Sequence, residues 1–292
     1  MDSERSGRMR TNKYWKYFDR VMKEYKKRVI SDEEVKEILD NRLNEMKDLI
    51  QKNERNRLAD RLKMGIGVHL EMNAKNRILN AEPLAWILLE QQLFWLIQMI
   101  KSNPSRRSVS DSQIGGLIGL SLLWGYEEIA ELTYKYATNM FMKDRDFYSE
   151  NNTHHVFMTC LYHYWKTGEM PEMFDVLPGE HVYQKLMRSW NDTNDFGEHL
   201  YELCDFHLYS LSDTPDKSSE ILSFDCIPYD YYCIQLIREK EGLATPNIDH
   251  PLLQTSLAEI PKDKPGYKLD EDEILQFVIQ NEKVPDAQRL IR

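Results

Sequence analysis

PLAWILLEQQLFWLIQMI, which runs from Pro83 to Ile100, is the most hydrophobic stretch of this 292-residue chain. Polar residues interrupt it at four positions, Glu90, Gln91, Gln92 and Gln98. It therefore contains no uninterrupted apolar run of about 18 residues, which a membrane-spanning helix would need. Proline suits the first turn of a helix, where its missing N–H leaves no hydrogen bond unmade. We predict a buried central helix in a soluble, cytoplasmic protein without a membrane partner.

Helical spacing of apolar residues continues on both sides of this stretch. Ser31 and Glu34 have the spacing of a capping box, Gly125 separates two helical segments, and Gly242 follows another as a C-terminal cap. No sustained period-2 alternation bounded by hairpin turns appears. The sequence predicts an all-α protein, a multi-helix bundle. Besides the central helix, the predicted helices cover residues 14–29, 32–50, 113–124, 126–141 and 229–241 and, at the end of the chain, about 269–281.

The clearest predicted loop is SNPSRRSVSDS, residues 102–112. We expect it to separate an N-terminal helical region, residues 1–101, from a helical body, residues 113–292, unless the two form one continuous domain. Soon after it, Gly115, Gly116 and Gly119 weaken a helix but let a neighbouring element approach closely. They do not form a phosphate-binding loop, because neither GxGxxG nor GxxxxGK[ST] occurs in the chain.

The body contains an internal echo. HVFMTCLYH (residues 155–163) and HLYELCDFH (residues 199–207) share the pattern H-x4-C-x2-H at an offset of 44 residues. That period is typical of paired-helix repeats. It predicts two related helical hairpins stacked side by side, although two copies with few matches also arise by chance.

The echo also raises the question of a metal site. Cys160, His163, Cys204 and His207 would form a Cys2His2 set if the two helices were adjacent, because residues i and i+3 share a helix face. The second pair, however, falls in the apolar stripe of its helix, where buried and hydrogen-bonded side chains are the commoner arrangement. We therefore predict neither metal nor cofactor, with the four residues as the alternative.

No local motif indicates catalysis. HExxH and GxSxG are absent, and no histidine follows a glutamate at the spacing used by di-iron bundles. Asp249-His250 is an adjacent acid–histidine pair that is followed directly by a proline. Pro251 pushes His250 into extended geometry, so that the two side chains point to opposite sides. We read the pair as a device that locks a turn, and we predict no catalytic residues and a protein that is not an enzyme.

Charge is unevenly distributed along the chain. Residues 1–63 contain 18 Lys/Arg and 13 Asp/Glu, whereas residues 64–292 contain 20 and 35, which gives net charges of +5 and −15. An acidic body disfavours nucleic acid as the main partner and favours a basic protein, although acidity also simply maintains solubility. The strongest local pattern is a stripe along one side of a predicted helix. Its residues are Asp195, Glu198, Glu202 and Asp205, with Asp192 just before them. The stripe is either a solvated face or a docking strip for a basic partner.

Several short motifs follow a charged helical N-terminal half: LMRSW (residues 186–190), IPYDYY (227–232), IREKEGL (237–243) and DHPLL (249–253). In this layout, and over residues 116–260, the chain resembles the all-α immunity proteins of bacterial polymorphic-toxin and contact-dependent competition systems, among them the Immunity protein 49 family. The basic helix at residues 13–29 has no counterpart in that pattern.

The resemblance implies a non-enzymatic protein that binds a cognate toxin and blocks its active site or substrate channel. An acidic helical surface suits this task, because toxins that act on nucleic acids have positive surfaces. The alternative function is a helical-repeat scaffold or sensor that binds a peptide or protein in a concave groove.

Overall fold

The structure is a computed structural model of the chain. It describes residues 14–282 except residues 17, 21, 25, 28, 83 and 110 and the stretches 64–65, 105–107, 144–152 and 211–226. Every regular element in this part is a helix, which confirms the predicted all-α, multi-helix class. None of these helices is long and apolar enough to cross a membrane.

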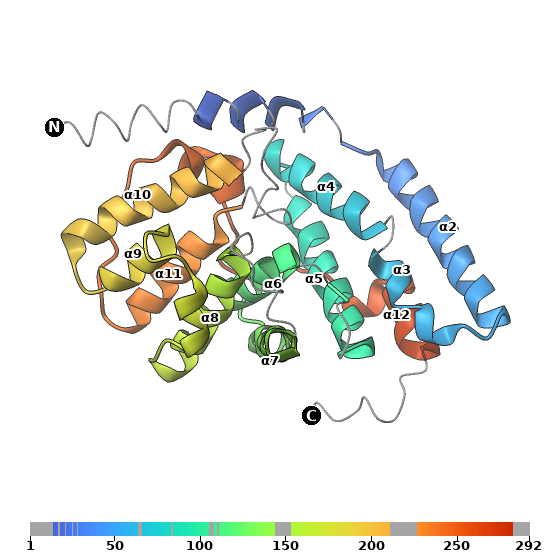
Figure 1. The fold of residues 1–292 in the computed structure, drawn as a ribbon. Coiled ribbons are helices and arrows are strands. Elements are labelled where there is room, and N and C mark those ends of the chain that lie inside the picture. The colour runs from blue at the N-terminus through green and yellow to red at the C-terminus, as the bar shows by residue number, and fades with distance from the viewer. Residues whose placement is uncertain are drawn as a thin grey trace.

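The helices pack against one another in a single bundle (Figure 1). Short 3-10 turns connect several of them, among them η4 (Pro251–Gln254), η5 (Ser256–Ala258) and η6 (Leu269–Glu271). The α-helices are α2 (Asp32–Gln51), α3 (Asp60–Lys63), α4 (Ile66–Leu79), α5 (Ala85–Ser102), α6 (Asp111–Leu123), α7 (Glu127–Lys143), α8 (Thr153–Thr167), α9 (Val182–Arg188), α10 (Thr193–Ser210), α11 (Tyr229–Lys240) and α12 (Glu273–Asn281). Positions 14–16, 18–20, 22–24 and 26 are helical as well.

Local signals fix several helix ends as predicted. The Ser31 hydroxyl accepts from the backbone N–H of Glu34, and the Glu34 carboxylate accepts from the N–H of Ser31, which completes the capping box of α2. Gly125, with φ of 69°, lies between α6 and α7, and Gly242, with φ of 74°, follows α11. Glycine adopts this left-handed conformation without a steric penalty, and it therefore ends both helices.

Helix α5 lies at the centre of the N-terminal half, as the 83–100 stretch predicted, although Pro83 itself lies outside the described residues. Its buried face packs mainly against α4 and α3. Glu90 is fully buried, and its carboxylate accepts hydrogen bonds from the Tyr126 hydroxyl and from the backbone N–H of Tyr267. Glu90, one of the polar residues that interrupt the apolar stretch, therefore joins α5 to later parts of the chain, whereas Gln92 bonds to Glu71 of the preceding helix.

The C-terminal segment returns to the N-terminal half. Asp272 caps α12 by accepting from the N–H of Leu275, and its other carboxylate oxygen accepts from the indole N–H of Trp95 at 2.7 Å. The 3-10 helix η5 packs on α4. Helix α12 packs on α2 and α5 (Figure 1). The segment 251–282 of the predicted body thus lies against the predicted N-terminal region. The division at residues 102–112 stays a prediction.

The two echo segments form the helices α8 and α10. Helix α8 packs mainly on α6 and α7, whereas α10 packs mainly on α9 and also contacts α11. Helix α6 is the hub of this half of the molecule, because α7, α8 and α11 all pack against it.

Two glycines of α6 make this packing possible. A Cβ atom on Gly115 would lie 2.8 Å from the His154 ring, and one on Gly119 would overlap the ring of Tyr229. The close approach expected from the glycine spacing is therefore real. It brings α8 and α11, through His154 and Tyr229, directly onto the backbone of α6.

Candidate functional site

Helix α10 carries the predicted acidic stripe on its outer side. Asp192, Asp195, Glu198 and Glu202 are exposed. The Glu202 carboxylate lies 3.1 Å from the Lys185 amine of α9, while no described residue forms an ion pair with Asp195 or Glu198. Asp195 is in the first turn of α10, where the helix dipole favours a negative charge; Glu198 and Glu202 lie beyond that turn. We call Asp192, Asp195, Glu198 and Glu202 the acidic strip.

The fifth predicted member, Asp205, is turned towards the protein. Only 16% of its side chain is exposed, and its carboxylate lies 3.2 Å from Nε2 of His250. The other ring nitrogen of His250, Nδ1, accepts from the backbone N–H of Leu252 at the start of η4. Nε2 therefore carries the proton and donates to Asp205. The segment that contains Asp249-His250-Pro251 is thereby locked along α10.

Asp249 takes no part in orienting its neighbour. Its carboxylate accepts from the side-chain amide of Gln254 at 2.7 Å. His250 is fully buried, and its ring packs edge-on against Tyr201 of α10. Asp249 and His250 therefore make two separate contacts that hold the turn, as we predicted from the proline at position 251.

The inner side of α10 is part of the core. Phe196, Leu200, Leu203, Cys204 and Leu208 are fully buried. His207, also fully buried, donates from Nε2 to a carboxylate oxygen of Asp230 at 2.7 Å. One helix therefore bears the acidic strip on one side and a buried charged contact on the other.

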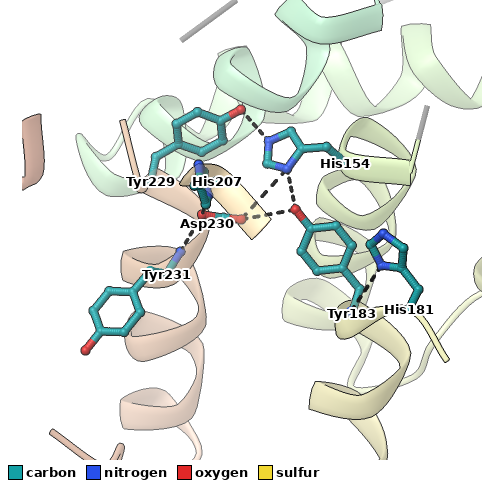
Figure 2. Close-up of polar contacts among 7 residues, drawn as sticks. All are labelled: His154, His181, Tyr183, His207, Tyr229, Asp230 and Tyr231. Carbon is teal, nitrogen blue, oxygen red and sulfur yellow. Dashed lines mark hydrogen bonds and ion pairs between the residues drawn. The ribbon is translucent and has the colours of Figure 1, made fainter. Parts of the chain in front are cut away.

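Asp230 is the end point of a buried hydrogen-bond cluster formed by four helices (Figure 2). Its members are His154 of α8, Tyr183 of α9, His207 of α10, and Tyr229 and Asp230 of α11. His154 lies between two tyrosine hydroxyls, with Nε2 bonded to that of Tyr229 and Nδ1 to that of Tyr183. We call these five residues the His–Tyr–Asp cluster.

The direction of each hydrogen bond follows from Asp230. The Tyr183 hydroxyl donates to Oδ2 of Asp230 at 3.2 Å, so Nδ1–H of His154 donates to the Tyr183 oxygen. Nε2 of the neutral imidazole then accepts from the Tyr229 hydroxyl. Oδ1 of Asp230 accepts from His207 and from the backbone N–H of Tyr231. The donors of His154, Tyr183 and Tyr229 are thereby satisfied along a path that ends on one carboxylate.

The pKa values follow from burial and from these contacts. Burial opposes the charged form of Asp230, but the neighbouring His207 and its hydrogen bond outweigh it, so the pKa of Asp230 lies below its usual range. Burial lowers the pKa of His154 to about 4 despite the attraction of Asp230. His181, whose Nδ1 accepts from the N–H of Tyr183, is also held neutral, because burial lowers its pKa to about 4.

Acid is expected to destabilise the protein through His154. Its pKa in the folded chain, about 4, lies below the ordinary value of 6.5, so the stabilisation is complete above pH 6.5 and is lost as pH falls. Between pH 6.5 and pH 4, His154 then costs about 1 kcal/mol per pH unit, and His181, whose pKa is lowered to the same value, adds a similar slope. Urea unfolding at half-unit pH intervals measures the slope, and imidazole NMR shifts assign it to His154. An His154 resonance that titrates near 6.5 in the folded protein would contradict this expectation.

The two histidines of the alternative metal set, Cys160, His163, Cys204 and His207, have separate partners. His163 contacts the Tyr134 hydroxyl through Nδ1, whereas His207 contacts Asp230. Burial raises the pKa values of the Cys160 and Cys204 thiols. Within the described residues, no three His, Cys, Asp or Glu side chains are grouped to hold a metal ion.

The sequence reasoning missed His154, Tyr183, Tyr229 and Asp230. One available signal was Asp230, a single acid inside the aromatic run IPYDYY, at a position where an apolar residue would be expected in a buried helix start. Another was the spacing of Gly115 and Gly119, which indicated a close neighbour without identifying it. Comparisons with protein-family models, with curated proteins and with solved structures found no match to this chain.

Proposed function

We propose that this protein is a non-enzymatic immunity protein that binds a basic, cognate bacterial toxin in the cytoplasm through the acidic strip of α10. The observation that carries the proposal is a row of exposed carboxylates, two of them without an ion pair among the described residues, on a helix whose opposite face is fixed in the core. The net charge of −15 over residues 64–292 adds a long-range field of the same sign. Such a field accelerates the association of a positively charged partner.

Rigid presentation supports binding by this face. The hydrogen bond from His207 to Asp230 fixes the buried face of α10 in the core. The contact of Asp205 with His250 fixes the C-terminal half of the same helix. Carboxylates on a pre-organised helix lose little conformational freedom on binding, so that more of their attraction appears as affinity. In this proposal the bound chain covers the active site or substrate channel of the toxin and needs no chemistry of its own.

Charge reversal tests the proposal. The variant Asp195→Lys/Glu198→Lys is compared with Glu33→Lys/Glu37→Lys, which makes the same charge change on exposed positions of α2, at the opposite side of the molecule (Figure 1). We expect the strip variant to weaken binding of the purified partner at least about 10-fold, mainly through slower association, because steering depends on local charge. The α2 variant should stay within about 2-fold, because distant charges are screened.

The partner is first captured from the native host with the wild-type chain and then purified. Binding is measured by surface plasmon resonance from 50 to 500 mM salt, and neutralisation is measured as growth of cells that co-express both proteins. A basic partner whose growth inhibition is relieved by the wild type and not by the strip variant supports the proposal. Salt-independent binding of a peptide, or equal affinity of the two variants, contradicts it and favours the scaffold or sensor.

A further inference from the structure

A groove of about 640 Å³ lies between α5, α7 and α12. Its floor contains the buried side chains of Ile129 and Leu275, while Ile279 on its wall is 44% exposed. The Tyr126 hydroxyl bonds to the buried Glu90, which fixes the wall of the groove just before α7. Charged side chains line the groove as well, so a ligand that fits it has both apolar and charged groups.

The unpaired charges in the groove are mainly positive. Lys101 and Lys264 are exposed, and neither forms an ion pair with any residue that the structure describes. Two carboxylates line the groove too, but that of Glu127 lies 3.9 Å from the Lys166 amine and is balanced by it. Glu128 is then the one unpaired carboxylate among the described lining residues, against two unpaired cations. Although the chain has a net charge of −10, this groove favours a negatively charged ligand.

The two lysines lie at different ends of the groove. The Lys264 amine is 4.2 Å from the ring centroid of Tyr126, and that ring meets the ring of Phe94 edge-on at 5.3 Å. Lys101 is seven residues further along α5, and Ile97 lies between them on the same helix face. Seven residues of helix span about 10 Å. The groove thus presents a cation, an apolar floor and a second cation in a line about two helical turns long.

We propose that this groove binds an amphipathic helix of a partner protein, with acidic residues at positions i and i+7 and apolar residues at i+3 and i+4. Such a helix places two carboxylates about 10 Å apart on the face that carries its apolar side chains. The carboxylates lie beside Lys264 and Lys101, and the apolar pair packs on Ile97, Ile129 and Ile279. Insertion of an apolar helix face into a groove is a common form of peptide recognition.

This surface is separate from the acidic strip and prefers the opposite charge. No α10 residue is among the described residues that line the groove. The helix-binding proposal therefore does not rest on the proposed immunity function. The strip variant Asp195→Lys/Glu198→Lys should bind the docking helix as the wild type does, so that the two proposals stand or fall separately.

Fluorescence polarisation with a synthetic peptide tests the groove in the full chain. The probe is a labelled, capped peptide of about 15 residues, a length that supports helix formation. It has glutamates at i and i+7 and leucines at i+3 and i+4 on a background of alanine and glutamine. Two matched peptides carry glutamine or lysine in place of both glutamates. We expect the glutamate peptide to bind at least about 10-fold more tightly than either matched peptide, because only its carboxylates pair with the two lysines.

Charge reversal in the groove locates the binding site. Lys101→Glu/Lys264→Glu is compared with Lys36→Glu/Lys47→Glu, the same charge change at exposed lysines of α2 that do not line the groove. The groove variant should bind the glutamate peptide at least about 10-fold more weakly and should prefer the lysine peptide, because the sign of the charge is reversed. The α2 variant should stay within about 2-fold of the wild type, because distant charges are screened.

A change on the apolar wall tests the other half of the match. Ile279→Asp should weaken binding at least about 10-fold, whereas Leu84→Asp, at a 70% exposed position before α5, should stay within about 2-fold. A dissociation constant above about 1 mM for the glutamate peptide overturns the proposal. Equal affinity for the glutamate and glutamine peptides also overturns it, and so does equal binding by the groove variant and the α2 variant.

Discussion

Replacing Asp230 with asparagine is expected to lower the free energy of unfolding by about 3–5 kcal/mol, the range found when one partner of a buried ion pair is removed. Asp230 accepts hydrogen bonds from Tyr183, His207 and the backbone of Tyr231, and it is fully buried. An asparagine has the same shape, but its NH2 group must face one of these donors. Two hydrogen-bond donors then face each other without an acceptor between them, and the buried His207 loses the negative charge of its partner.

The measurement is urea unfolding at pH 7.5 for Asp230→Asn and for the control Asp195→Asn on the surface of α10. Because the pKa of Asp230 is lowered in the folded chain, its stabilisation is fully present above the ordinary aspartate pKa and is lost only as pH falls through the lowered value. The control is expected to change stability by less than about 0.5 kcal/mol. A loss below about 1 kcal/mol for Asp230→Asn would mean that the pair with His207 does not hold the cluster together.

Gly119→Ala is expected to destabilise the protein by about 2 kcal/mol, although the same change in an open helix position is stabilising by up to about 1 kcal/mol. The added Cβ atom would overlap Cδ2 of Tyr229, well inside 3.0 Å. That ring cannot move aside without breaking its bond to His154, because both side chains are fully buried. Overpacking of this kind costs about 1–3 kcal/mol or more, and we expect it to exceed the gain in helix propensity.

Gly197→Ala is the matched control, since Gly197 also lies in a helix and a Cβ atom there would meet Pro246 at an ordinary 3.4 Å. Thermal and urea unfolding of the two variants compare the same chemical change with and without the overlap. We expect Gly197→Ala to be neutral or slightly stabilising. If Gly119→Ala were as stable as Gly197→Ala, α11 would not lie against α6 as described.

The features predicted from the sequence are those that neighbouring residues determine. The capping box at Ser31, the break at Gly125 and the turn at His250 each depend on contacts within a few positions. The central helix was equally visible, because most of its positions are buried and apolar. The all-α class follows from the sum of such signals.

The His–Tyr–Asp cluster could not be predicted in the same way. Its bonds join residues separated by 23 to 75 positions, and their geometry depends on how four helices cross. Nor does helical spacing distinguish Asp205, which bonds to His250, from Glu198, which faces solvent. The difference comes from the segment around residues 246–250, which runs along α10 from Gly197 and places His250 beside Asp205.

The two-sided character of α10 separates what keeps this protein folded from what a partner would recognise. Substitutions at Asp195 and Glu198 change no buried contact among the described residues, and surface changes of this kind usually alter stability by less than about 0.5 kcal/mol. A lineage could therefore replace these carboxylates one by one to follow a changing partner while His207 and Asp230 stay as they are. In this fold, recognition can diverge quickly on a scaffold that does not have to change.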